Sequence, residues 1–155
     1  MVHLLVPGQP PISIEALIDS GASDSFLDPS ILVRYHLHPL PHPNPIQLDF
    51  IDGSVPATGP ITHYFPSQLR VHGSHSEDLT FQVTRLGHFQ MVLGFPWLRR
   101  HSPRIDWAVG TLTFDSPLCT TTCIPPPLPS PPPSSLSPPP PSPSPPPCQL
   151  VYDRY

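Results

Sequence analysis

The amino-acid sequence predicts an all-β domain followed by a proline-rich tail, and two observations lead to this prediction. From Val2 to Phe114, short runs of aliphatic and β-branched residues are separated by turn residues, which is typical of strands joined by tight turns. From Ser116 to Leu150 the sequence contains no charged residue and consists mostly of Pro, Ser, Thr and Leu. Such a composition buries too little apolar surface to offset the entropy lost on ordering. We therefore expect a domain over residues 1–117 and a disordered Pro/Ser-rich linker or tail over 118–155.

Turn residues and prolines separate the expected secondary-structure elements. Alternation and β-branched residues predict two early strands, separated by a turn cluster around Gly8. A short helical or irregular stretch comes next, and then an irregular loop with four prolines. Further strands, a helix that opens with Pro96 and a last hairpin complete the domain. The strands are expected at 2–6, 12–18, 46–51, 61–65, 68–72, 79–83, 91–93, 105–107 and 111–114, the helical segments at 30–35 and 96–101, and the loop at 39–45. Trp97 and Trp107 are expected to pack in the core.

The composition argues against several classes of function. A net charge of −4 offers no basic surface for nucleic acid. The three cysteines are an odd number and all lie in the expected tail, which argues against a disulfide-stapled core. No signal peptide or apolar membrane span is apparent, so we expect a cytoplasmic protein without membrane contact.

Metal ligation is not favoured by the spacing of histidines and cysteines. Cys119-x-x-x-Cys123 lacks a second Cys or His pair beside it in the sequence. The histidine groups, His36/His38/His42 and His72/His75, have no carboxylate or cysteine at a suitable spacing to complete a ligand set. We therefore expect solvent-exposed loop histidines, no metal and no cofactor.

One short motif carries the chemistry. The strand Ala16-Leu17-Ile18 leads into Asp19-Ser20-Gly21-Ala22, so an aliphatic strand delivers one carboxylate into a tight turn. Aspartic proteases present their catalytic aspartate in this way. Peptide hydrolysis by this route needs two aspartates that share a proton. Because the motif occurs once, a second copy of the chain must supply the other aspartate.

Later segments extend the pattern. Phe26-Leu27 follows the turn, and Leu93-Gly94-Phe95-Pro96-Trp97-Leu98 precedes Ile105-Asp106-Trp107. Over residues 2–119 this order resembles the retroviral-type aspartic proteases. Within them it is most similar to the proteases of gypsy-type long-terminal-repeat retrotransposons, of the vertebrate sushi class, and to the genes domesticated from that class. The resemblance implies a retropepsin-like, closed β-barrel-type fold with one short C-terminal helix.

The resemblance also implies a role for each matching residue. Asp19 is the catalytic aspartate in the active-site loop, Ser20 bonds across the dimer axis, Gly21 admits the substrate backbone and Ala22 lines the cleft. The flap would contain Ile51, Asp52, Gly53 and Ser54, and the loop would be supported by Val92, Leu93 and Gly94. Ser23 and Phe95 stand where familiar retroviral enzymes have Asp and Arg or Asn, so apolar packing is expected in place of an ion pair.

The implied function is an aspartic endopeptidase that is active as a homodimer, formed through the active-site face, with one Asp per subunit activating water. Its substrate would be a polypeptide, namely a retrotransposon polyprotein. The alternative is a catalytically silent domesticated or decayed retroelement fragment that acts as a structural or interaction module. The tail has PxxP spacing, as in Pro125-Pro126-Pro127-Leu128-Pro129, which suits SH3- or WW-type domains. Because specific docking usually also needs a nearby Arg or Lys, a linker role is favoured.

Overall fold

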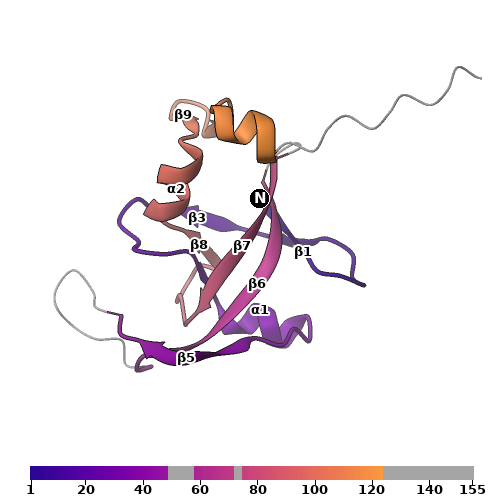
Figure 1. Ribbon diagram of the computed structural model, residues 1–155, viewed down its shortest axis with the longest axis vertical. Helices are drawn as coiled ribbons and strands as arrows, with labels where there is room; N and C mark the ends of the chain where they lie inside the picture. The colour runs from indigo at the N-terminus through magenta and orange to yellow at the C-terminus, as the bar shows by residue number, and fades with distance from the viewer. Residues whose placement is uncertain (49–57, 72–74, 124–155) are drawn as a thin grey trace, which may run out of the picture.

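The computed structural model describes residues 1–48, 58–71 and 75–123. Its main feature is one curled β-sheet (Figure 1). Eight strands form this sheet within the described residues, and two more form a separate hairpin. The strands are β1 (Val2–Leu5), β2 (Ile12–Ile14), β3 (Ala16–Ile18), β4 (Phe26–Leu27), β5 (Leu40–Ile46), β6 (Ile61–Val71), β7 (His75–Val83), β8 (Met91–Leu93), β9 (Arg104–Asp106) and β10 (Thr111–Thr113). The helical elements are α1 (Pro29–Arg34), α2 (Phe95–His101) and the π-helical turn η1 (Cys119–Cys123).

The strand order shows why the sheet curls. The order is β2-β1-β6-β7-β4-β8-β3, with β5 also paired to β6. Only Glu15 separates β2 from β3 in the chain, yet these two strands lie at opposite ends of the order. The chain therefore brings the two edges of the sheet together, and the sheet approaches a closed barrel. This confirms the predicted mostly β fold of the closed-barrel type.

The core follows the two-residue period of the strands. In β1 the side chains of Val2 and Leu4 are buried, and the residues between and after them are partly exposed. In β8 all three residues are buried, because this strand lies between β3 and β4 in the sheet. The aliphatic run that ends at Gly94 is thus buried along its whole length.

Strand β6 runs unbroken through a proline, whereas the sequence suggested two shorter strands over 61–65 and 68–72. Pro66 pairs with Thr80 of β7 along one edge of β6. On its other edge, β5 pairs at Tyr64 and β1 pairs from Gln68 onwards. Neither strand reaches Pro66, so its missing N–H costs no ladder hydrogen bond on that edge. This explains why the proline does not end the strand.

A second expectation was wrong: residues 39–45 were interpreted as an irregular loop, but most of them belong to strand β5. The segment Leu40–Ile46 pairs antiparallel with β6, with a register shift between Pro41 and Ile46. Successive N–H groups of an extended strand point to opposite edges, so prolines at every second position remove donors from one edge only. A strand paired on one side tolerates this loss, and among the described strands β5 pairs only with β6.

The C-terminal elements gather at one end of the sheet. Helix α2 and the turn η1 (orange) lie at the top of Figure 1, at the end of the molecule that also carries β9. The two cysteines of η1 are buried, so the packed domain reaches Cys123 and passes the expected boundary at residue 117. Within the described residues, no helix has the length and hydrophobicity needed to cross a membrane.

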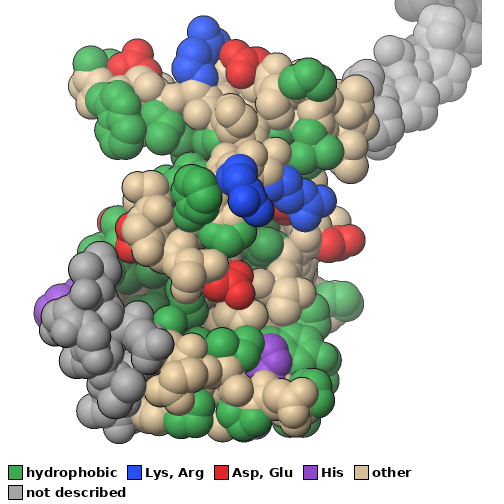
Figure 2. Space-filling view, turned by 60° about the vertical axis from the view of Figure 1, so that its left-hand side comes forward, with side chains coloured by type: hydrophobic (Ala, Val, Ile, Leu, Met, Phe, Trp, Pro, Cys, Tyr) green, Lys and Arg blue, Asp and Glu red, His purple; other side chains and the backbone are tan. Residues whose placement is uncertain are grey.

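The two tryptophans have different environments. Trp97 of α2 is buried, as predicted. Trp107 is 85% exposed, which corrects the expectation of core packing. It lies in the turn of the β9–β10 hairpin, which is separate from the main sheet, and the described residues leave it largely uncovered. Hydrophobic side chains are accordingly visible at the top of the surface in Figure 2.

Asp28 joins helix α1 to the sheet and gives a stability prediction. Its Oδ1 accepts a hydrogen bond from the Ser30 N–H, and its Oδ2 accepts one from the Leu86 N–H, each at 2.9 Å. Burial acts to raise the pKa of Asp28, but these hydrogen bonds outweigh burial and hold the pKa below its ordinary value of 3.8. The ionised carboxylate therefore stabilises the fold.

We expect Asp28→Ala to lower the free energy of unfolding by about 1–2 kcal/mol at neutral pH, measured by urea titration. A carboxylate with a lowered pKa stabilises above its ordinary pKa, and this contribution is lost as the pH falls through the folded-state value. The difference between wild type and variant should therefore vanish in acid. The matched control is Asp78→Ala, at an exposed position, with an expected change within about 0.5 kcal/mol. A difference that persists unchanged in acid would contradict the prediction.

Candidate active site

Asp19 lies at the carboxyl end of β3 in a turn that fixes its backbone and its carboxylate. The Asp19 N–H donates to the Leu93 carbonyl at 3.0 Å, which ties the residue to the neighbouring parallel strand β8. The Ala22 N–H donates to the Asp19 carbonyl at 3.3 Å and closes the turn. The Gly21 N–H donates to Asp19 Oδ1 at 2.8 Å. The carboxylate is thus oriented by its own turn and remains partly exposed.

Gly94 lies directly against this turn. A Cβ atom at residue 94 would overlap the carbonyl oxygen of Asp24 and would come within 2.7 Å of that of Ala22. The next residue, Phe95, donates its N–H to the Ala22 carbonyl at 2.9 Å. Glycine is required here for space, since its φ of −91° is open to any residue. The end of β8 therefore supports the Asp19 turn through backbone atoms alone.

Asp24, the first acid after Asp19 in the sequence, links the loop to the sheet. Its Oδ1 accepts from the Ser25 N–H at 2.7 Å, and its Oδ2 accepts from Gln82 Nε2 at 2.9 Å. Gln82 Oε1 lies 2.6 Å from His42 Nε2, so this polar chain connects the turn to β7 and β5. Asp24 is therefore a structural bridge, whereas the Asp19 carboxylate accepts a hydrogen bond from Gly21 of its own turn.

The two departures from the retroviral pattern lie at the surface. Ser23 is exposed, and the Phe95 ring is 48% exposed. The guanidinium of Arg99 lies 5.9 Å from the centre of the Phe95 ring, a cation–π distance. The apolar packing expected in place of an ion pair is therefore not made by Phe95 inside this protomer. Instead its ring is presented at the surface beside Ala22.

The supporting residues and the turn share a small apolar cluster. Phe26, Ile61 and Val92 are buried together, and Ala22 and Leu48 pack against them. The cluster therefore reaches from the active-site turn to the chain on both sides of the expected flap. Strands β5 and β6 pair there, with Ile46 opposite Ile61. The expected flap residues themselves, Ile51, Asp52, Gly53 and Ser54, lie outside the described residues.

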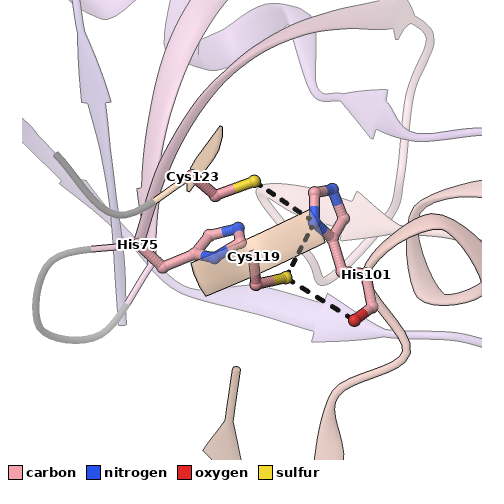
Figure 3. A group of neighbouring side chains, drawn as sticks. All are labelled: His75, His101, Cys119 and Cys123. Atoms are coloured by element: carbon pink, nitrogen blue, oxygen red, sulfur yellow. Dashed lines mark hydrogen bonds between the residues drawn. The ribbon is translucent and has the colours of Figure 1, made fainter. Parts of the chain in front are cut away.

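A second group of chemistry-bearing side chains was missed by the sequence analysis. His75, His101, Cys119 and Cys123 are all buried, and one donor atom from each lies within 4.8 Å of the others. Figure 3 shows the four side chains converging from β7, α2 and η1. This corrects the expectations that His75 is exposed and that the cysteine pair has no partners. The Cys119-x-x-x-Cys123 spacing was a usable signal, but nothing in the sequence places His75 or His101 beside it.

Glu77 organises this cluster electrostatically. The carboxylate is buried, with Oε1 accepting from Trp97 Nε1 at 2.6 Å and Oε2 lying 2.7 Å from His101 Nε2. Burial acts to raise the pKa of Glu77, but the hydrogen bonds from His101 and Trp97 outweigh it and lower the pKa. Burial lowers the pKa of His75 and raises the pKa of the Cys123 thiol to about 11. Glu77 is therefore a carboxylate at neutral pH, and His75 is neutral.

The contact between Gly94 and the turn predicts the effect of adding one methyl group. We expect Gly94→Ala to lower the free energy of unfolding by about 1–3 kcal/mol, because the neighbouring atoms are backbone carbonyls that must move apart. The measurement is urea unfolding followed by circular dichroism. Ser23→Ala, an exposed change in the same loop, should shift stability by less than about 0.5 kcal/mol. Equal stability of Gly94→Ala and wild type would show that the turn does not depend on this contact.

Comparison with known proteins places the chain in a family. Among solved structures it resembles the retroviral protease-like domain of Ddi1 from Leishmania major, with 21% identity, a TM-score of 0.44, and coverage of 66% of this chain and 74% of that one. The model of the PEG10/RTL1 protease domain matches residues 15–123, a range that contains the Asp19 turn, Gly94 and all four residues of the His/Cys cluster. On this match over most of its length, the chain belongs to the PEG10/RTL1 protease domain family.

Proposed function

We propose that this protease domain is an aspartic endopeptidase that works as a homodimer, with Asp19 of each subunit activating the attacking water. The observation that carries the proposal is the Asp19 turn, in which Leu93 holds the backbone and the Gly21 N–H orients the carboxylate. A general base must be held in place and yet reach the solvent, and the partly exposed Asp19 carboxylate meets both conditions.

The proposed chemistry follows from placing two such carboxyls across a two-fold axis. Both cannot ionise at close range, so the pair shares one proton. The ionised carboxylate takes a proton from water, and the water oxygen attacks the scissile carbonyl carbon. The protonated carboxyl donates a hydrogen bond to the carbonyl oxygen as negative charge develops there. Ser20 of each turn would bond across the axis.

The arrangement of acids supports the need for a second subunit. Asp24 is engaged by Ser25 and Gln82, and Asp28 caps α1. Within the described part of the chain, neither carboxylate can share a proton with Asp19 without giving up these bonds. The protomer thus offers one half of a dyad, and a second copy would complete it.

The surface around the turn supports the choice of interface. Ser20 and Gly21 are exposed, and so is Phe95, whose backbone N–H bonds to the Ala22 carbonyl. An aromatic ring at a surface is a frequent anchor of protein–protein contacts. We therefore place the dimer interface on this active-site face.

The proposed substrate is a polypeptide, in the first instance the polyprotein of the retrotransposon from which the family derives. The segment with Ile51, Asp52, Gly53 and Ser54 would close over the bound peptide. The competing function is a catalytically silent scaffold that retains the fold. The two are separated by the following experiment.

Asp19→Asn should abolish cleavage of a mixed peptide library by the full chain at mildly acidic pH, with cuts mapped by mass spectrometry. Loss of the acid–base group should reduce the rate by at least about 10²-fold. The matched control is Asp78→Asn on the exposed face of β7, which should cleave at the wild-type rate. Wild-type protein that is folded and concentrated but makes no cuts would favour the scaffold. Cuts that persist in Asp19→Asn would assign the hydrolysis to another group.

Activity per chain should fall on dilution, because the proposed active species dissociates. Phe95→Asp should raise the dimer dissociation constant at least about tenfold, measured by analytical ultracentrifugation. Phe89→Asp changes a similarly exposed ring before the other end of β8 and should leave the constant unchanged. Activity per chain that stays constant over a wide dilution series would overturn the dimer.

A further inference from the structure

Four soft or borderline metal donors meet in the interior at the end of the sheet that carries α2 and η1. Two are thiols from Cys119 and Cys123, and two are imidazoles from His75 and His101. All four residues are buried, and their donor atoms lie within 4.8 Å of one another. Figure 3 shows that these side chains point toward a common centre.

The distances in the cluster approach those of a tetrahedral metal site. Bonds of about 2.3 Å from zinc to sulfur and about 2.0–2.1 Å to nitrogen place neighbouring donor atoms roughly 3.3–3.8 Å apart. Cys119 Sγ lies 3.4 Å and Cys123 Sγ 3.8 Å from His101 Nδ1. The remaining donor pairs lie within 4.8 Å, so shortening these distances by at most about 1–1.5 Å would bring them to ligand spacing.

Glu77 lies beside the Nε2 atoms of both imidazoles, and Nδ1 of His101 lies near the two cysteine sulfurs. Nε2 of His101 lies 2.7 Å from one carboxylate oxygen, and Nε2 of His75 lies 3.3 Å from the other. A ring that donates from Nε2 carries its lone pair on Nδ1. In the described part of the chain, His75 Nδ1 is buried without a hydrogen-bond partner. A carboxylate that accepts from the far nitrogen of a histidine is a regular companion of metal-bound imidazole.

We propose that His75, His101, Cys119 and Cys123 form a structural Zn²⁺ site, with Glu77 as the hydrogen-bond acceptor that positions both histidines. Two thiolates and two imidazoles in tetrahedral arrangement are characteristic of zinc, and the Cys-x-x-x-Cys spacing lies in the range of known structural sites. Binding releases two thiol protons to solvent, and the two thiolates balance the charge of the ion. With four protein ligands, all buried, the site has no open position for substrate, so its role is structural and independent of the proposed peptidase chemistry.

Such a site would connect three elements that are separate in the sequence. His75 and Glu77 come from β7, His101 ends α2, and the cysteines form the two ends of η1. Helix α2 begins at Phe95, which bonds to the Ala22 carbonyl of the Asp19 turn. The ion would therefore hold in place the helix whose first residue supports that turn.

The test is metal content and Co²⁺ substitution in the full chain purified under reducing conditions. We expect one zinc per chain by elemental analysis and, after exchange, the visible spectrum of tetrahedral thiolate-bound Co²⁺. Zinc should also protect two of the three cysteines from alkylation, mapped by mass spectrometry to Cys119 and Cys123. Removal of the metal with a strong chelator should lower the Tm, and added Zn²⁺ should restore it.

Matched variants separate this site from adventitious binding. Cys119→Ser and Cys123→Ser should each lose stoichiometric zinc, whereas Cys148→Ser and the exposed His63→Ala should retain it. If a ligand variant fails to fold, the alkylation pattern of the wild-type protein decides the question. Folded protein without zinc or a Co²⁺ spectrum would overturn the proposal. A Cys119–Cys123 disulfide under reducing conditions, or zinc retained by both cysteine variants, would do the same.

Discussion

The close approach of Gly94 to the Asp19 turn is the contact on which the rest of the structure depends. Strand β8 lies between β3 and β4, and its end runs under the loop that joins them. The Leu93 carbonyl holds Asp19, and the Phe95 N–H holds Ala22, so the two residues that flank Gly94 fix the turn from below. Any side chain at residue 94 would push the strand away from the loop. The orientation of the Asp19 carboxylate therefore depends on residue 94 having no side chain.

The buried polar cluster depends on Glu77 in a comparable way. Taking a carboxylate out of water is costly unless it is hydrogen-bonded, and Glu77 is contacted by Trp97, His101 and His75. These partners come from α2 and from β7 itself, so the carboxylate joins helix to sheet. The His75 ring also stacks on Phe114 at a centroid distance of 4.0 Å, which extends the same packing to the chain beyond β10. One charged group thus organises most of the C-terminal end of the domain.

Much of the fold followed from local sequence signals, and the failures have physical causes. The strands at 2–6 and 91–93, the Pro96 helix and the last hairpin were predicted within one residue, because side-chain period and turn residues are local properties. The strand expected at 12–18 is instead the two strands β2 and β3, and the strand expected at 79–83 begins at His75. The continuity of β6 through Pro66 was not predicted, because the cost of a missing N–H depends on which edge of the strand is paired. The surroundings of His75 were also missed, because its neighbours come from elements far along the chain and only the sheet topology brings them together. In the candidate site, Asp19 and Gly94 were found by motif, whereas the bridging role of Asp24 depends on Gln82, which no motif indicates.

The alternating prolines of β5 affect whether this strand can pair with another polypeptide. Among the described strands, β5 pairs with β6 alone, and an unpaired strand edge is a template on which another polypeptide can extend the sheet. Prolines at positions 41, 43 and 45 have no N–H, so β5 has fewer donors for further pairing than an ordinary strand. Proline in an edge strand is one way in which natural sheets resist intermolecular pairing, and β5 has this feature shortly before the segment expected to form the flap.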